Sequence, residues 1–323
     1  MKRILLVLLL FAATVQLAFA QKMKVGYWTS GFSLGFGAVM EEMKFAEKEG
    51  LEVQWVKFGD VNGPTRAIVP RAIDLAFGAP SFASMNIAAD GVPVRIVLAT
   101  QIAESKLVVP EASPIRSLAD LRGKRLGVTP PGSAMHAIVS AVLDGNYGMK
   151  SGAYSVVPGN EAQIARFLAR QEIDAAVLRS VTLAQISDLQ LRTLGGVVEE
   201  WKKLTRSNAA PILAVTIVHE DYLAQHPDAV AKFIAAVRKA VRFGSRNTLQ
   251  VAQILQKAAN MSPAAALAYA SQWDGAYMAS FEPADIASLK RMQEILRASG
   301  LARKDPPESA FHAEPYQRSK RIK

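Results

Sequence analysis

The segment RLGVTPPGSAMHAIVSAVLDGN, residues 125–146, gives the clearest indication of the fold. It joins a short apolar strand, Arg125–Val128, through a turn rich in proline and glycine to a helix over Ser133–Asn146. The alternation continues through a strand, a helix and a strand: Ser155–Val157, Glu161–Arg170 and Asp174–Leu178. This order predicts a mainly parallel sheet with helices on both faces.

A second set of the same kind precedes this segment. Its strands are expected at Lys24–Trp28, Leu51–Trp55, Ile73–Phe77 and Val92–Ala99. Its helices are expected over the apolar positions 36–46, ending at Gly50, and over Thr65–Ala72 and Ser81–Ala89. A late apolar run, Pro211–Val218, then precedes a region that is almost wholly helical. This layout predicts that the second set is inserted into the first, with crossings near Glu104–Lys106 and Asn208–Pro211.

The fold class we predict is α/β, with two doubly wound lobes around a hinge and the C-terminal helices packing on lobe I. A chain of 323 residues is long enough for two domains. The expected divisions are a signal peptide at 1–20, lobe I at 21–104 and 209–310, lobe II at 105–208, and a loose basic tail at 311–323.

Composition excludes several classes of protein. The chain has no cysteine, which excludes disulfides, thiolate zinc sites, iron–sulfur clusters and cysteine nucleophiles. Its net charge is +10, but 38 basic residues stand beside 28 acidic ones, so both signs are abundant. The only dense basic run is the C-terminal tail, and we therefore expect no nucleic-acid partner.

Three motifs suggest catalysis or metal binding without completing a site. Residues 31–35, GFSLG, match the nucleophile elbow of hydrolases around Ser33, but they follow the first strand, and no histidine stands in a recognisable context for the base. Residues 127–133, GVTPPGS, have Ser133 where a phosphate loop needs lysine. The four histidines lack the paired spacing of metal ligands. We therefore expect no enzyme activity, no metal and no cofactor.

Residues 117–128, SLADLRGKRLGV, followed by Gly132 and Ser133, resemble a signature of solute-binding proteins of ABC importers, in the nitrate/sulfonate/taurine (NMT1/THI5-like) group. AIDLAFGAPS at 72–81, EIDAAVLRS at 172–180 and DYLAQHPDAVAKFIAAVRKA at 221–240 extend the resemblance over most of the chain. It implies a type II periplasmic binding protein fold, a small-molecule ligand such as a small organic anion, an ABC permease in the inner membrane as partner, and a monomer.

The ligand is expected at the carboxyl ends of the strands, where the two lobes face each other. By the family pattern, the walls come from loops that follow strands in each lobe. The candidate binding residues are Trp28, Thr29, Ser30, Gly78, Pro80, Ser81, Gln101, Gly132, Ser133, Met135 and Arg179. Trp28 could stack on a planar ligand or pack against a helix, and Ser81 and Ser133 could bind ligand or cap their helices.

Arg179 is the candidate for the main charged contact, because it follows the apolar strand Asp174–Leu178 and so emerges at a carboxyl end. Its guanidinium suits a carboxylate or sulfonate, and a salt bridge to an acid of either lobe is the alternative. If it binds ligand, truncation should hardly change melting of the free protein. Two other functions stay open: an exported hydrolase using Ser33, and a periplasmic receptor that passes its ligand to a sensor.

Export generates the first testable prediction. Lys2 and Arg3, the apolar run Ile4–Phe11 and the small-residue site Ala18-Phe19-Ala20 form a signal peptide pattern. We expect cleavage after Ala20 and release into a bacterial periplasm. N-terminal sequencing of the exported protein should begin at Gln21, and a sequence beginning at Met1 would refute the prediction.

Overall fold

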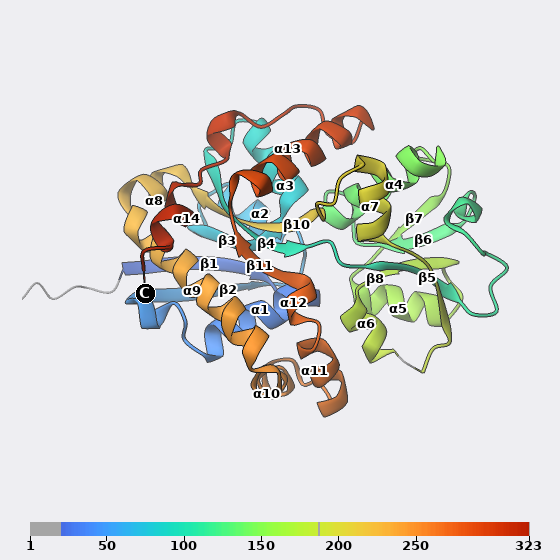
Figure 1. Ribbon diagram of the computed structural model, residues 1–323, viewed down its shortest axis with the longest axis horizontal. Coiled ribbons are helices and arrows are strands. Elements are labelled where there is room, and N and C mark those ends of the chain that lie inside the picture. Colours follow the sequence, from blue (N-terminus) through green and yellow to red (C-terminus); the bar gives the residue numbers. More distant parts are fainter. Residues whose placement is uncertain (1–20, 187, 323) are drawn as a thin grey trace, which may run out of the picture.

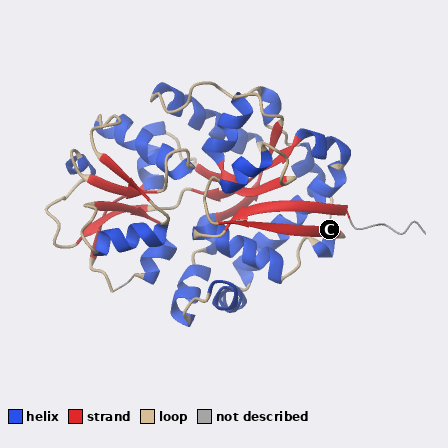
Figure 2. Cartoon of the chain, turned by 180° about the vertical axis from the view of Figure 1, so that it is seen from behind, coloured by secondary structure: helices blue, strands red, loops and turns tan. Residues whose placement is uncertain are grey.

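The computed structural model describes residues 21–186 and 188–322, so the predicted leader lies outside the described residues. Figure 1 shows two α/β bodies side by side, a larger one at the left and a smaller one at the right. Each body contains one sheet with helices on both of its faces (Figure 2). Within the described ranges, no helix combines the length and apolar character needed to cross a membrane.

The larger body contains a six-stranded sheet in the order β2-β1-β3-β10-β4-β11. β1 pairs in parallel with β2 and β3, whereas β10 is antiparallel to both of its neighbours, β3 and β4. All residues of β3 and β10 are buried, which is typical of central strands covered on both faces. The strands are β1 (Gln21–Trp28), β2 (Leu51–Phe58), β3 (Leu75–Pro80), β4 (Val94–Ile102), β10 (Ile212–His219) and β11 (Tyr277–Ser280).

The smaller body contains a five-stranded sheet in the order β7-β6-β8-β5-β9. β6 pairs in parallel with β7 and β8, and β5 runs antiparallel to β8 and β9. β5 and β9 were not among the strands expected from the sequence. The strands are β5 (Lys106–Pro110), β6 (Arg125–Val128), β7 (Ser155–Pro158), β8 (Ala175–Leu178) and β9 (Leu191–Gly196).

Helices cover both sheets. Those of the smaller body are α4 (Ala134–Tyr147), α5 (Glu161–Ala169), α6 (Ser180–Gln185) and α7 (Val197–Thr205). Those of the larger body are α1 (Gly31–Glu42), α2 (Gly63–Ile68), α3 (Ser81–Ala89), α8 (Glu220–Gln225), α9 (Pro227–Arg246), α10 (Thr248–Ala259), α11 (Pro263–Ala270), α12 (Trp273–Ala276), α13 (Pro283–Ala298) and α14 (Glu314–Ser319). Short 3₁₀ turns lie at Glu47–Glu49, Leu118–Leu121 and Glu308–Ala310.

We propose that the larger body is lobe I, residues 21–104 and 209–310, and that the smaller body is lobe II, residues 105–208. The chain leaves the first sheet after β4 and returns to it at β10, and every strand of the second sheet lies between these two points. The two segments that join the bodies run side by side, as a hinge between two lobes requires (Figure 1).

The first helix is shorter than its apolar spacing indicated. The sequence predicted one helix through Ala46 to Gly50, but α1 ends at Glu42 and Lys44 adopts a left-handed conformation with φ of 52°. Phe45 is nevertheless buried, and its ring lies 5.6 Å from that of Phe243 on α9. The turn therefore keeps the apolar pattern in the core while it redirects the chain.

The prediction of a loose tail at 311–323 is wrong for the described part of that segment. α14 packs on α9, and Tyr316 is only 5% exposed. Nη1 of Arg318 lies 2.6 Å from Oδ1 of Asp228, and Lys320 pairs with Glu282. The basic residues of the tail find acidic partners on lobe I, which composition alone does not reveal.

Aromatic rings fix the C-terminal helices on lobe I. The Trp273 ring centroid lies 5.7 Å from that of Phe36 and 4.3 Å from that of Tyr277. Its indole nitrogen donates to the carbonyl oxygen of Val241 at 3.0 Å. Gly244 on α9 leaves room for this ring, because a β-carbon there would lie 2.0 Å from the Trp273 side chain.

Replacement of Gly244 by alanine should therefore destabilise the protein by about 1–3 kcal/mol, since the Trp273 ring has to move in a packed core. Gly275→Ala is the matched control, because a β-carbon at Gly275 meets nothing within 4 Å. Urea titration measures both variants. Equal midpoints for Gly244→Ala and wild type would contradict this packing.

Candidate functional site

Four strands end at the face where the lobes meet, and a helix begins shortly after each. In lobe I, β1 leads to α1 and β3 leads directly to α3. In lobe II, β6 leads to α4 and β8 leads to α6. This is the position at which doubly wound sheets bind ligands, because loops and helix N-termini converge there.

Residues of both lobes line a small cavity of about 20 Å³, which we call the inner cavity. Seven of the residues predicted from the sequence line it: Trp28, Gly78, Pro80, Gln101, Ser133, Met135 and Arg179. Residues outside the list of candidate binding residues also line it: Ser33, Val61, Thr129, Ala134, Leu213 and Ala214. The two lobes thus contribute jointly to the cavity.

The other four predicted residues lie elsewhere. Thr29 and Ser30 line a neighbouring cavity of about 410 Å³, which we call the outer cavity. Ser81 is fully buried, and its hydroxyl donates to the carbonyl oxygen of Ile212 at 2.7 Å, so it ties α3 to β10. Gly132 lines neither cavity and faces Asn62, whose Nδ2 would lie 3.4 Å from a β-carbon at Gly132.

Arg179 forms a buried ion pair within lobe II. Its Nε lies 3.1 Å from Oε1 of Glu161, and the two residues are only 3% and 4% exposed. The other carboxylate oxygen of Glu161 accepts a hydrogen bond from Thr182 on α6. The salt bridge that the sequence left as an alternative for Arg179 therefore exists.

Arg179 also reaches across to lobe I. Its guanidinium carbon lies 5.6 Å from the centre of the Trp28 ring, within the range of a cation–π interaction. A β-carbon at Gly31 would lie 1.8 Å from Nη1 of Arg179, so the guanidinium can keep this position only while the first residue of α1 is glycine. The Arg179 guanidinium of lobe II thus lies against Trp28 and Gly31 of lobe I.

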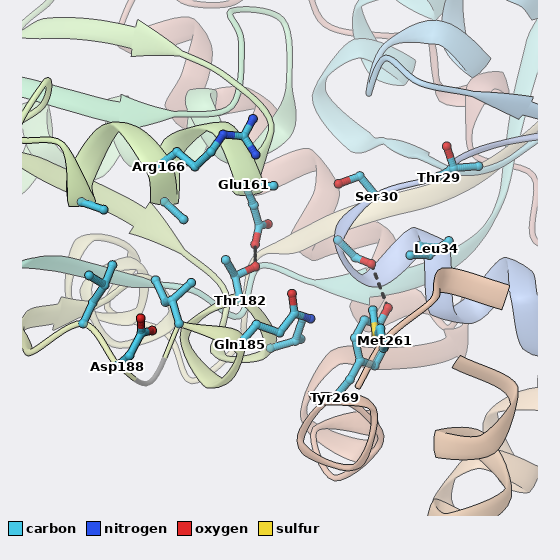
Figure 3. Close-up of a pocket in the computed structure, with 17 residues that line it drawn as sticks. Thr29, Ser30, Leu34, Glu161, Arg166, Thr182, Gln185, Asp188, Met261 and Tyr269 are labelled. Atoms are coloured by element: carbon cyan, nitrogen blue, oxygen red, sulfur yellow. Dashed lines mark hydrogen bonds between the residues drawn. The ribbon is translucent and has the colours of Figure 1, made fainter. Parts of the chain in front are cut away.

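Glu161 and Tyr269 border the outer cavity from opposite lobes (Figure 3). Its lining is partly apolar, with Leu34, Ala165, Val181 and Leu189 among the residues. The Tyr269 hydroxyl donates to the carbonyl oxygen of Gly31 at 2.8 Å and accepts from the amide of Gly35 at 3.0 Å. Burial raises the pKa of Tyr269 above its ordinary value, and the two hydrogen bonds of its neutral hydroxyl hold the start of α1 in place.

Three further hydrogen bonds position the lobe II part of the site. The Ser180 hydroxyl donates to Glu104 at 2.5 Å, and the Ser180 amide donates to the same carboxylate at 3.2 Å. Glu104 lies in the segment between β4 and β5, so its carboxylate connects the proposed hinge to the start of α6, next to Arg179. Ser133 caps α4, accepting from the amide of His136 at 3.3 Å, as its helix-capping alternative implied.

The geometry around Ser33 does not supply a nucleophile with its base. The Ser33 hydroxyl accepts from Nε2 of Gln101 at 3.2 Å, and no histidine is among the described residues of the inner cavity. Over the same described part of the chain, no group of three or more His, Asp or Glu side chains could hold a metal ion. The inner cavity presents hydroxyls, an amide and a guanidinium, but its volume of about 20 Å³ leaves room for about one water, so a larger polar molecule can reach these groups only when the lobes move apart.

Two α/β lobes joined by a double crossing, with a shared cavity at the strand ends, define a protein with the periplasmic binding protein fold. The sequence model of the NMT1/THI5-like family matches residues 39–247. The chain belongs to this family, as its sequence resemblance indicated.

Individual relatives agree with this membership. A putative binding protein of Brucella abortus is 26% identical over 249 residues, which cover 77% of this chain and 75% of the relative. The taurine-binding periplasmic protein of Escherichia coli is 28% identical over 192 residues, which cover 58% of this chain and 56% of that protein.

Solved structures share the fold. The alkanesulfonate-binding protein SsuA of Xanthomonas axonopodis, bound to MOPS, superimposes with a TM-score of 0.74 at 19% identity, covering 92% of this chain and 98% of that one. The aliphatic sulphonate-binding SsuA of E. coli gives 0.71 at 17% identity, covering 88% and 90%.

The packing of Arg179 against Gly31 and Trp28 generates a prediction about lobe closure. Gly31→Ala should push the guanidinium away from Trp28 and hold the lobes further apart, which small-angle X-ray scattering would detect as a larger radius of gyration. Gly91→Ala is the control, because Gly91 also has a positive φ, of 90°, but a β-carbon there meets nothing within 4 Å. Both variants bear a backbone strain of about 1–2 kcal/mol. Identical scattering from both variants would contradict the proposed packing of Arg179 against Gly31 and Trp28.

Proposed function

We propose that this chain is the exported solute-binding protein of an ABC importer. In this proposal it captures a small organic anion, sulfonate-, taurine- or nitrate-like or related, between its lobes and delivers it to a permease in the inner membrane. The observation that carries the proposal is Arg179, which is buried at the junction of the lobes between Glu161 of lobe II and Trp28 of lobe I.

The chemistry of the inner cavity supports an acidic solute. A guanidinium presents a planar set of donors that fits the oxygens of a carboxylate or sulfonate. Ser33, Gln101 and Ser133 bring further hydrogen-bonding groups from both lobes. The names of two relatives, a taurine-binding and an alkanesulfonate-binding protein, point to the same class of solute.

Capture works through lobe closure. A solute that contacts both lobes stabilises the closed arrangement by the difference between its affinities for the closed and the open state. The double crossing between β4 and β5 and between α7 and β10 is the natural hinge. The closed form then presents one surface made of both lobes to the permease, and it does so without converting the solute. We further propose that the protein acts in the periplasm as a monomer and binds no nucleic acid.

Truncation of the guanidinium tests the proposal. A charge-assisted hydrogen bond contributes about 1.5–3 kcal/mol, so Arg179→Ala should weaken binding of an acidic solute by roughly one to two orders of magnitude. Isothermal titration calorimetry with taurine, isethionate, β-alanine and 3-hydroxypropionate measures this. Arg170→Ala, which removes an exposed arginine of lobe II outside the cavities, should bind as wild type does.

The sequence-based expectation of unchanged melting for Arg179→Ala is revised by the ion pair. The variant leaves the buried Glu161 carboxylate without its guanidinium, and we expect a loss of about 3–5 kcal/mol in the free energy of unfolding. Titrations therefore belong well below the melting temperature of the variant. Undiminished affinity in folded Arg179→Ala, or tight binding of uncharged solutes only, would sink the proposal.

A further inference from the structure

Among the described residues that line the cavities between the lobes, basic side chains do not outnumber acidic ones, although they do so in the whole chain. Besides the inner and outer cavities, a third cavity of about 370 Å³ lies beside Trp28, between residues of both lobes. The basic residues that line these three cavities are Arg166 and Arg179, and the acidic ones are Asp60, Glu161 and Asp188. The net charge of +10 is therefore carried outside these three cavities.

The deepest charge in the cleft is already balanced. Glu161 and Arg179 form a pair with no net charge, and both side chains are almost fully buried. An acid that approaches the guanidinium also approaches the carboxylate, and like charges about 4–6 Å apart repel strongly when they are shielded from water. A simple anion thus gains from Arg179 and loses to Glu161.

A solute with both charges fits this pair better than a simple anion. If the acid group of the solute lies at Arg179 and its ammonium lies at Glu161, each charge of the solute faces the opposite charge of the ion pair. Because Nε and Oε1 of the pair are 3.1 Å apart, the two charges of such a solute have to be separated by only a few bonds. Arg179 lines the inner cavity and Glu161 lines the outer one, so the pair offers each charge its own side.

The outer cavity also supplies acceptors for an ammonium. Figure 3 shows Ser30 across the cavity from Glu161, and Thr29 brings a further hydroxyl oxygen to the lining. The volume of about 410 Å³ falls in the range of small-molecule sites. Hydroxyl and carboxylate oxygens around one side of the ion pair suit a group that donates hydrogen bonds.

We propose that Glu161 is a specificity-determining residue that selects small zwitterions, acids that also carry an ammonium group, over acids that lack one. This inference rests on the proposed function, because it assumes capture of an acidic solute at Arg179. It adds a substrate class and a residue, Glu161, that sequence reasoning had treated only as the start of a helix.

Calorimetry with two matched pairs of acids tests the inference. Taurine and isethionate differ only in an ammonium against a hydroxyl, and β-alanine and 3-hydroxypropionate differ in the same way. Wild type should bind at least one aminated acid roughly tenfold or more tighter than its hydroxylated partner. Glu161→Gln should weaken the aminated acid and strengthen the hydroxylated one, because it removes both the attraction and the repulsion.

Two variants separate this role from others. Glu172→Gln removes an exposed acid of lobe II that lines none of the three cavities and should keep the preference of wild type, which ties the preference to the buried carboxylate. Glu161→Asp keeps the charge and should keep the sign of the preference. If Glu161 merely positions Arg179, Glu161→Gln weakens both members of a pair equally, and the inference is overturned.

Binding to the wild-type protein alone also tests the inference. Equal binding of the two members of each pair, or tighter binding of the hydroxylated acids, would overturn the inference and leave the proposed function standing. Binding of none of the four acids would count against both. Thermal melting of each variant confirms that the comparison is made between folded proteins.

Discussion

The buried pair of Arg179 and Glu161 is the constraint on which the site depends. A buried ion pair offsets the cost of removing its charges from water only when its geometry and its additional hydrogen bonds are good. Thr182 bonds to the carboxylate, and the Trp28 ring lies against the guanidinium from the opposite lobe. Gly31 lacks a side chain where this guanidinium lies. The ion pair of lobe II therefore restricts the residue that lobe I can carry at position 31.

The elements around this pair connect it to the rest of the molecule. Tyr269, on a C-terminal helix, holds the backbone of Gly31 and Gly35. On the other side, Glu104 in the hinge bonds to Ser180, which directly follows Arg179. A movement of the hinge therefore acts on the turn that carries the guanidinium. The proposed capture by lobe closure requires such a link between the hinge and the binding residues.

Much of the candidate site could be predicted from the sequence, because doubly wound sheets bind ligands at the carboxyl ends of their strands and the residues there can be read from the strand pattern. That rule brought Trp28 and Arg179 to the same cavity. Applied to the strand Ser155–Val157 it would also have pointed to Glu161, which lies shortly after it. Ser81 could not be judged, because its hydroxyl is engaged by Ile212, a residue 131 positions away.

Double electron–electron resonance between spin labels on the two lobes tests the central claim most directly. The chain has no cysteine, so Arg170→Cys on lobe II and Gln253→Cys on lobe I, both at exposed positions, provide the only two labelling sites. The distance distribution is measured without solute and with whichever of the four acids binds most tightly at saturation. Our account predicts a shift to one shorter, narrower distribution that Arg179→Ala does not show at the same concentration. Saturation without any change in the distribution would contradict capture between the lobes.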